Sequence, residues 1–240
     1  NDAGRSVIRY ARLIQTDLAH LREEIIGIMS GEGGRVAVGT IMGAVPLLTT
    51  AISRVIADHP KLSIEIVEDT SAALLGQLDS GRLDLAICRT TVSTTPYLYE
   101  SATFVEETLA VIASTQHPFA YARQLSLKDL VDYRWVVYRA NMPMRLLLER
   151  EFHEADLRFP VHLLETTSAF ATLSLLQENP TLVALVSTDV AKFCTGYGFT
   201  TTLPLPITSR SEPYELVSRK GVPDSPAARL LREALLNPPR

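Results

Sequence analysis

The sequence predicts an α/β fold arranged as two lobes, and three observations support this class. Strand-like segments, either alternating or continuously apolar, recur along the 240 residues and are separated by segments with helical periodicity. A chain of this length with 46% hydrophobic residues can bury one large core or two modest cores. The polar, proline-ended stretch 89–96 interrupts the alternation, as a crossing between two lobes would.

The stretch 35–88 has the order strand, helix, strand, helix, strand. We expect these elements over residues 35–39, 44–59, 62–67, 72–78 and 83–88. His59 precedes a proline, which disfavours helical angles and ends the first helix, and Thr70 or Ser71 offers a hydroxyl cap for the second. The last strand is almost entirely apolar, which is typical of a parallel strand covered by helices on both faces.

Parallel sheets covered by helices bind ligands beyond the carboxyl ends of their strands. In this stretch, the strand ends are followed by the turns 40–43, 69–71 and 89–91. Because the carboxyl ends of parallel strands meet at one edge of a sheet, we expect these three turns to contribute to one binding site.

The N-terminal residues predict a long helix that pairs with another helix. Apolar residues step alternately by four and three at Val7, Ala11, Ile14, Leu18, Leu21, Ile25 and Ile28. This pattern leaves open the alternative of a helix that lies on its own domain. Basic and acidic residues balance over 1–35, so the segment is not a basic arm for phosphate contacts. The glycine-rich residues 30–34 end the helix and form a flexible joint.

Beyond residue 96 the same alternation predicts a second lobe. We expect strands over 108–113, 135–138, 161–165, 182–186, 199–203 and 214–218. We expect helices over 126–130, 141–155, 169–177, 189–194 and 226–236. Pro143 suits the first turn of its helix, where no N–H is needed.

Composition excludes several classes of function. The formal charge of −4, from 23 basic and 27 acidic residues, gives no bulk attraction for a polyanion. Cys88 and Cys194 match neither a metal-binding spacing nor a disulfide framework, which fits a reducing cytoplasm. No apolar run reaches the roughly 18 residues of a membrane span, and no signal peptide is visible. We expect a cytoplasmic location, no membrane partner, no metal and no cofactor.

The sequence also lacks the groups that an enzyme needs. The five histidines are scattered, and neither a G-x-S-x-G elbow nor an H-E-x-x-H pair is present. No nucleophile with a base, carboxylate pair or metal cluster has a useful spacing. We therefore expect no catalysis, and a turnover assay would test the enzyme alternative.

A ligand-binding cleft is better supported. Helix starts that carry hydroxyl groups occur at Thr40, at 70–71 and at 166–168, and they would surround one anion-friendly cleft if two lobes face each other. The alternative is that each hydroxyl only caps its own helix. Met42, Met142, Met144 and Phe170 could form apolar walls, although methionines near helix starts more often fill the core.

Two arginines lie near the expected cleft. Arg145 is in the first turn of a helix, where the helix dipole disfavours a cation, so its position needs a partner. A ligand carboxylate is one candidate, and Glu149 one turn later is the other. Arg89 ends the last strand of the first lobe and could face the ligand or form a salt bridge at a hinge.

The motifs resemble those of a known family. Residues 34–87, ending in "LDSGRLDLAI", resemble the start of the effector-binding domain of LysR-type transcriptional regulators. The matching features are a strand ending in Gly-Thr, the "VPLL" helix opening, the "HP" break, "VEDTS" and the "SGRLDLAI" turn. "HPFA", "NMPMR", "ETTSAFATLSLL" and "YELVSRKGVPDSPAARLLREAL" resemble the second lobe and the closing helix of the same regulators. The resemblance covers essentially all 240 residues.

The resemblance implies two Rossmann-like lobes joined by a hinge, as in type II periplasmic binding proteins, preceded by a long linker helix. The linker and dimerisation helix would be 1–30, the first lobe 35–95 together with 220–240, and the second lobe 96–219. A winged helix-turn-helix domain that reads DNA would lie upstream and is absent from this chain. The partners implied are a small-molecule inducer, DNA through that absent domain, and further copies of the chain in a homodimer or homotetramer. Dimer contacts would involve 44–58 and the partner's 169–177.

The family's ligand contacts come from the turns described above. Carried over to this chain, and joined by Arg89, they are Thr40, Ile41, Met42, Ser71, Arg89, Met142, Arg145, Thr166, Thr167 and Ser168. The expected function is the sensing of an inducer, with a carboxylate as the expected class, in the interlobe cleft to control DNA binding and transcription. A solute-binding protein that delivers a ligand to a transporter is the alternative, but a heptad helix over 1–30 has no role in such a receptor.

Overall fold

The computed structural model describes residues 34–103, 106–140 and 142–237, together with nine positions nearer the N-terminus. These nine, all helical and exposed, are Gly4, Val7, Tyr10, Ala11, Ile14, Leu18, Leu21, Arg22 and Ile25. The helix expected over 1–30 is therefore present at the positions that are described, while Ile28 and residues 30–33 of the joint expected over 30–34 lie outside them. The chain forms two compact units, Asn1–Val105 with Pro213–Arg240, and Glu106–Glu212.

The described part of unit 1 contains a five-stranded sheet in the order β2-β1-β3-β10-β4. Its strands are β1 (Arg35–Thr40), β2 (Ser63–Glu68), β3 (Leu85–Cys88), β4 (Tyr99–Thr103) and β10 (Glu215–Arg219). β1 pairs in parallel with both β2 and β3, which confirms the parallel arrangement predicted for this stretch. β10 pairs antiparallel with β3 and β4. The sequence analysis did not identify β4.

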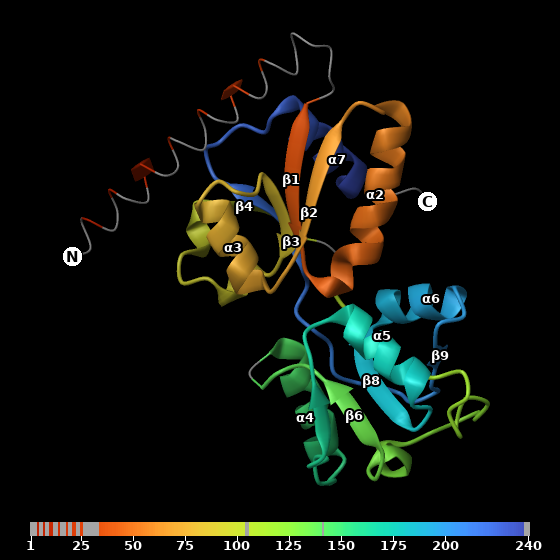
Figure 1. Cartoon of the computed structure of the whole chain (residues 1–240). Helices are drawn as coiled ribbons and strands as arrows, with labels where there is room; N and C mark the ends of the chain where they lie inside the picture. Colours follow the sequence, from red (N-terminus) through yellow and green to blue (C-terminus); the bar gives the residue numbers. More distant parts are fainter. Residues whose placement is uncertain are drawn as a thin grey trace. The chain divides into compact units, whose positions relative to one another are not determined.

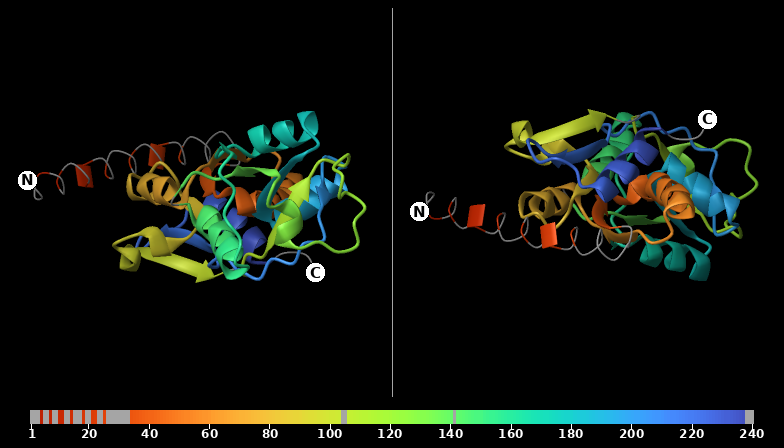
Figure 2. Two further views of the ribbon diagram at one scale, coloured as in Figure 1. Left: turned by 90° about the horizontal axis from the view of Figure 1, so that it is seen from below. Right: turned by 90° about the horizontal axis from the view of Figure 1, so that it is seen from above.

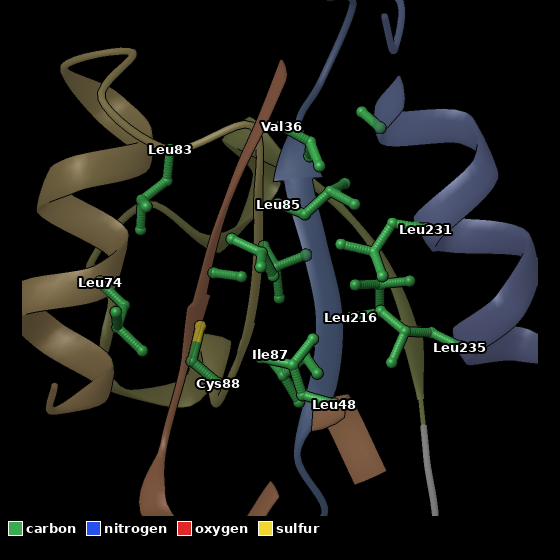
Figure 3. Packing of buried hydrophobic residues seen from close by; sticks show 14 of the residues in the cluster. Val36, Leu48, Leu74, Leu83, Leu85, Ile87, Cys88, Leu216, Leu231 and Leu235 are labelled. Atoms are coloured by element: carbon green, nitrogen blue, oxygen red, sulfur yellow. The ribbon is translucent and has the colours of Figure 1, made fainter. Parts of the chain in front are cut away.

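Helices cover both faces of this sheet, as predicted from the apolar β3. They are α2 (Val45–Asp58), preceded by a 3-10 turn (Met42–Ala44), then α3 (Ser71–Asp79) and α7 (Pro226–Leu236). α3 lies on one face, while α2 and α7 pack side by side on the other (Figures 1 and 2). In the core, Leu74 of α3 and Leu231 and Leu235 of α7 point at the sheet from opposite sides (Figure 3).

The described part of unit 2 contains a second five-stranded sheet in the order β7-β6-β8-β5-β9. Its strands are β5 (Leu109–Ala113), β6 (Arg134–Val137), β7 (Leu163–Glu165), β8 (Leu182–Ser187) and β9 (Thr201–Thr202). β6 pairs in parallel with β7 and β8, and β5 pairs antiparallel with β8 and β9. The α/β class and the two sheets confirm the predicted fold.

Among the described residues, three helices accompany the second sheet, namely α4 (Pro143–Glu154), α5 (Ala169–Glu178) and α6 (Thr188–Gly196). Leu148 and Phe152 attach α4 to the core of this unit, where Phe152 packs edge-on against Trp135 at 5.6 Å between ring centroids. The segment expected as a helix at 126–130 is a 3-10 turn, Leu127–Leu130, and two further 3-10 turns are Thr90–Val92 and Pro96–Leu98.

The boundaries between the units differ from the expected ones. We expected the second lobe to span 96–219, whereas the second compact unit spans Glu106–Glu212. The reason is the pairing of β4 with β10, which places Ala102 opposite Leu216 within the first sheet. Both segments that flank unit 2 are thus strands of unit 1. No helix among the described residues is long and apolar enough to cross a membrane.

Candidate functional site

The turn after β1 is held in place by backbone bonds to the neighbouring strands. Thr40 is fully buried, and its Oγ1 donates to the carbonyl of Ile41 at 3.0 Å, so this hydroxyl does not cap a helix. The Ile41 N–H donates to the carbonyl of Ile87 in β3 at 3.0 Å, and the Asp69 N–H donates to the carbonyl of Thr40 at 3.2 Å. Met42 begins the 3-10 turn and is half-buried.

The turns after β2 and β3 contact each other. Thr70 caps α3, because its Oγ1 accepts from the N–H of Ala73 at 3.4 Å. Ser71 has a different partner, since its Oγ accepts from the N–H of Arg89 at 3.2 Å. The structure thus brings together Ser71 and Arg89, two residues that the sequence analysis placed in the same site. Arg89 is buried, with 6% of the residue exposed.

Glu215, which the sequence analysis did not single out, organises the end of β3. Its Oε2 accepts from the Thr90 N–H at 3.2 Å and from the Thr90 hydroxyl, and its Oε1 accepts from Ser101 Oγ at 3.1 Å. Burial, assisted by the Glu215 charge and opposed by Arg89, raises the pKa of the Cys88 thiol to about 12. An acidic residue in the apolar run of "YELVSR" is the signal that could have identified this carboxylate.

Arg145 of α4 has several partners within unit 2. Its Nε donates to Glu149 Oε1 at 2.6 Å and its Nη1 to Glu165 Oε1 at 3.3 Å. The guanidinium carbon lies 4.6 Å from the centroid of the Phe159 ring, and 8% of the residue is exposed. Glu149, the alternative partner considered from the sequence, is thus paired with Arg145. A ligand carboxylate at Arg145 would have to join or replace these carboxylates, so its role in binding stays a prediction.

The turn after β7 contains three of the predicted site residues. Thr166 donates its N–H to the carbonyl of Val137 in β6 at 3.0 Å, and its Oγ1 accepts from the Ser168 N–H at 3.0 Å. Ser168 caps α5, because its Oγ accepts from the N–H of Ala171 at 3.2 Å. Thr167 is exposed, and Phe170 in the first turn of α5 is 79% exposed.

Within each unit, the predicted residues gather where parallel strands end. In unit 1 these are Thr40, Ile41, Met42, Ser71 and Arg89, which follow or end β1, β2 and β3. In unit 2 they are Met142, Arg145, Thr166, Thr167 and Ser168, which follow β6 and β7. Met142 is half-buried at the N-cap of α4 and offers no side-chain cap.

The hydroxyl groups of these turns share one chemical property. The oxygens of Thr70, Ser71, Thr166 and Ser168 all accept a backbone N–H. A hydroxyl oxygen that accepts one backbone N–H keeps its O–H to donate to a ligand and has one acceptor site fewer, and the N-termini of α3 and α5 add partial positive charge. The turns therefore suit a ligand that accepts hydrogen bonds. The described residues include no group of three His, Cys, Asp or Glu side chains that could hold a metal ion.

Comparisons with known proteins identify a matching family and several similar regulators. The family described as "LysR substrate binding domain" matches residues 30–238. The HTH-type transcriptional regulator GbpR of Azospirillum brasilense is 29% identical over 234 residues, which cover 97% of this chain and 68% of that protein. The chain spans 54%, 63% and 68% of the length of three such regulators.

Solved structures show the same fold. The effector binding domain of QuiR in complex with shikimate has a TM-score of 0.65 and 16% identity, covering 85% of this chain and 95% of that chain. The BenM effector binding domain with its effector benzoate has a TM-score of 0.61 and 20% identity, covering 84% and 90%. The chain therefore belongs to the LysR substrate binding domain family, the effector-binding part of LysR-type transcriptional regulators.

Proposed function

We propose that this chain is the ligand-sensing domain of a LysR-type transcriptional regulator and that its inducer is a small carboxylate. The observation that carries the ligand class is the set of hydroxyl groups whose oxygens accept backbone N–H bonds at the carboxyl ends of the parallel strands. Such groups offer donors, and a carboxylate accepts on both oxygens without having to donate.

The titles of the solved relatives support the choice of probe. Shikimate and benzoate, which are named with the domains of QuiR and BenM, both carry a carboxylate. At 16% and 20% identity these likenesses establish the fold alone, so the two compounds serve as starting points for a panel. The relative from Azospirillum brasilense is a regulator, which favours this function over delivery of a solute to a transporter.

The proposed regulator acts as a homodimer or homotetramer and reaches DNA through an N-terminal domain outside this chain. Support for self-association comes from the described positions of the heptad pattern. Val7, Ile14, Leu18, Leu21 and Ile25 are helical and between 47% and 67% exposed, so this apolar seam has room for a second helix. Inducer binding would then change how the DNA-reading domains are spaced. The shift of this equilibrium is limited by the difference in the inducer's affinity for the two arrangements.

A thermal melt against a panel of carboxylates, sugars and amino acids tests the ligand class. A ligand at a hundred times its Kd stabilises the folded state by about 2.7 kcal/mol, which corresponds to a shift of roughly 5–10 °C for a chain of this size. We expect a saturable shift with carboxylates that their amides do not reproduce. A shift with sugars or amines alone would contradict the carboxylate assignment.

Two threonine variants then test the assigned turn. Thr167→Val removes an exposed hydroxyl from the predicted site. Thr195→Val makes the same change at an exposed position of α6 outside the predicted set, where the hydroxyl lies 3.2 Å from Thr202 Oγ1. We expect Thr167→Val to weaken carboxylate binding about tenfold, the loss of one hydrogen bond to a charged group, and Thr195→Val to leave it unchanged. Equal affinity in both variants would remove Thr167 from the site.

A further inference from the structure

Glu151, in the last turn of α4, is a buried carboxylate that lies outside the turns predicted to bind the ligand. Its Oε1 accepts from the N–H and the hydroxyl of Thr208, each at 2.9 Å, and from the N–H of Ser209. Only 6% of the residue is exposed. Burying a carboxylate is costly unless it is hydrogen-bonded, so three donors on one oxygen form a strong and specific anchor.

The anchored residues lie at the point where the chain leaves unit 2. We call residues 208–212 the return segment, because unit 2 ends at Glu212 and the chain continues into unit 1. The Ser211 N–H donates to the carbonyl of Glu107 at 3.1 Å, and Arg210 Nη1 lies 3.0 Å from Glu106 Oε2. The return segment is thus bound to the first residues of unit 2, and Glu151 anchors this segment at Thr208 and Ser209.

The N-terminal end of α4 carries Met142 and Arg145, two of the predicted ligand-binding residues, and we call it the ligand turn. Met142 is the N-cap of the helix, and Arg145 in its first turn binds Glu149 and Glu165. The two ends also share one packed aromatic group, because Arg145 lies over Phe159 and Phe159 packs against Phe152 at 5.3 Å between centroids. Phe152 has no exposed surface and follows Glu151 directly.

These contacts leave α4 little freedom to move independently of the residues that its two ends bind. A helix of 12 residues is about 18 Å long, and close-packed helices shift as units and do not deform continuously. A displacement of Met142 and Arg145 by a bound ligand would therefore reach Thr208 and Ser209 through Glu151.

We propose that Glu151 is a positioning residue that couples the ligand turn at the start of α4 to the return segment, an inference that rests on the proposed ligand-sensing function. Glu151 does not touch the ligand. It determines whether a change at the first turn of α4 alters the segment through which unit 2 connects to unit 1.

A double-mutant cycle without ligand tests the coupling directly. Amide hydrogen exchange at Thr208 and Ser209 is measured in the parent, Arg145→Gln, Glu151→Gln and the double variant. We expect Arg145→Gln to accelerate exchange at these amides roughly fivefold in the parent, within the range reported for coupled sites, and to have little effect once Glu151 is Gln. A role of Glu151 in stability alone predicts independent effects that multiply, and that result would overturn the proposal.

Two further variants keep the test decisive. Glu154→Gln makes the same change at an exposed position of α4 and should leave the response to Arg145→Gln intact. Thr208→Val removes one of the three donors while Glu151 stays in place, and it should also reduce the response to Arg145→Gln. This variant replaces Glu151→Gln in the test if Glu151→Gln does not fold. A full response to Arg145→Gln in Thr208→Val would contradict the coupling.

Benzoate and shikimate serve as ligand probes in a second arm. If either binds the parent, we expect it to change exchange at Thr208 and Ser209 in the parent and in Glu154→Gln, but not in Glu151→Gln, whose affinity should change less than about twofold. An identical change in Glu151→Gln would overturn the coupling while the sensing function stands. If no carboxylate binds, the proposed ligand class fails, and the ligand-free cycle still decides the role of Glu151.

Discussion

At the residue scale, the buried charged side chains of the candidate site and its surroundings have partners that lie far away in the sequence. Glu151 accepts from Thr208 and Ser209, and Arg145 binds Glu165 as well as its helical neighbour Glu149. Only the Arg145–Glu149 pair follows from helical spacing. The other partners are brought together by the fold, which is why sequence reasoning considered a ligand as the partner of Arg145.

His117 shows how burial of one polar residue affects stability. Its Nδ1 accepts from the Phe119 N–H at 3.0 Å, its ring lies 4.9 Å from Tyr133, and Nε2 is buried with no hydrogen-bond partner in the described part of the chain. Burial lowers the pKa of His117. The unfolded chain therefore binds a proton more readily than the folded chain, and the stabilising contribution is present above the unfolded pKa of about 6.5 and is lost as the pH falls below it.

We accordingly expect the free energy of unfolding to fall between pH 7.5 and pH 5 more steeply in the parent than in His117→Asn, which keeps an acceptor for the Phe119 N–H. Urea unfolding at both pH values measures the difference. His153→Asn, at an exposed position of the same unit, is the control and should follow the parent. A parent and a His117→Asn variant with the same pH dependence would contradict this account.

At the element scale, the approach of α3 to β1 depends on a glycine. A Cβ at Gly39 would lie 2.6 Å from Leu74 Cδ2 and 2.6 Å from Leu83 Cδ1. Both leucines are at most 1% exposed, so neither side chain has free space into which it could turn. A Gly39 Cβ would therefore force a shift of α3 or of the strand.

Two glycine variants with opposite expected signs test this packing. Gly39→Ala should destabilise the protein by about 1–3 kcal/mol, the usual cost of overpacking a core. Gly76→Ala, on α3 where a Cβ meets nothing within 4 Å, should stabilise by about 1 kcal/mol through helix propensity. Chemical denaturation of both variants measures the two changes. A neutral Gly39→Ala would show that α3 can move away from β1 at little cost.

At the scale of the whole molecule, each unit has its own core. The first core includes Leu48, Leu74 and Leu231, and the second includes Trp135, Leu148 and Phe152. A substitution in one core should therefore lower the local stability of its own unit first, because different regions of a protein can open separately with different free energies.

Phe152→Ala provides the test. Removal of this fully buried ring should cost about 3–5 kcal/mol and accelerate amide exchange in β6 and β8, while β1 and β3 keep their protection. Phe170→Ala, which removes a ring that is 79% exposed, should change stability by less than about 0.5 kcal/mol. Equal loss of protection in both sheets after Phe152→Ala would show that the units open as one.

Most elements could be predicted from the sequence because periodicity is a local property. The alternation of 35–39 and the helical spacing of 44–59 predicted β1 and α2 to within a few residues, and the almost entirely apolar 83–88 predicted a parallel strand between helices. The positions of the candidate turns followed in the same way, since they are the residues after parallel strands, while their role in binding stays a prediction. β4 was missed, and the second lobe was expected over 96–219 where the second unit spans Glu106–Glu212, because the pairing of Tyr99–Thr103 with Glu215–Arg219 joins segments more than a hundred residues apart.

The sequence by itself determined the α/β class, the order of the principal elements, the candidate turns and the resemblance that the family match confirmed. Only the tertiary structure decided which side chains meet at the ends of those elements. It placed Arg145 between Glu149 and Glu165, Ser71 against Arg89, and Glu151 under the return segment. The physical reason is that backbone periodicity depends on neighbours within one or two turns, whereas a buried charge is satisfied by whatever donors or acceptors the packed chain brings to it.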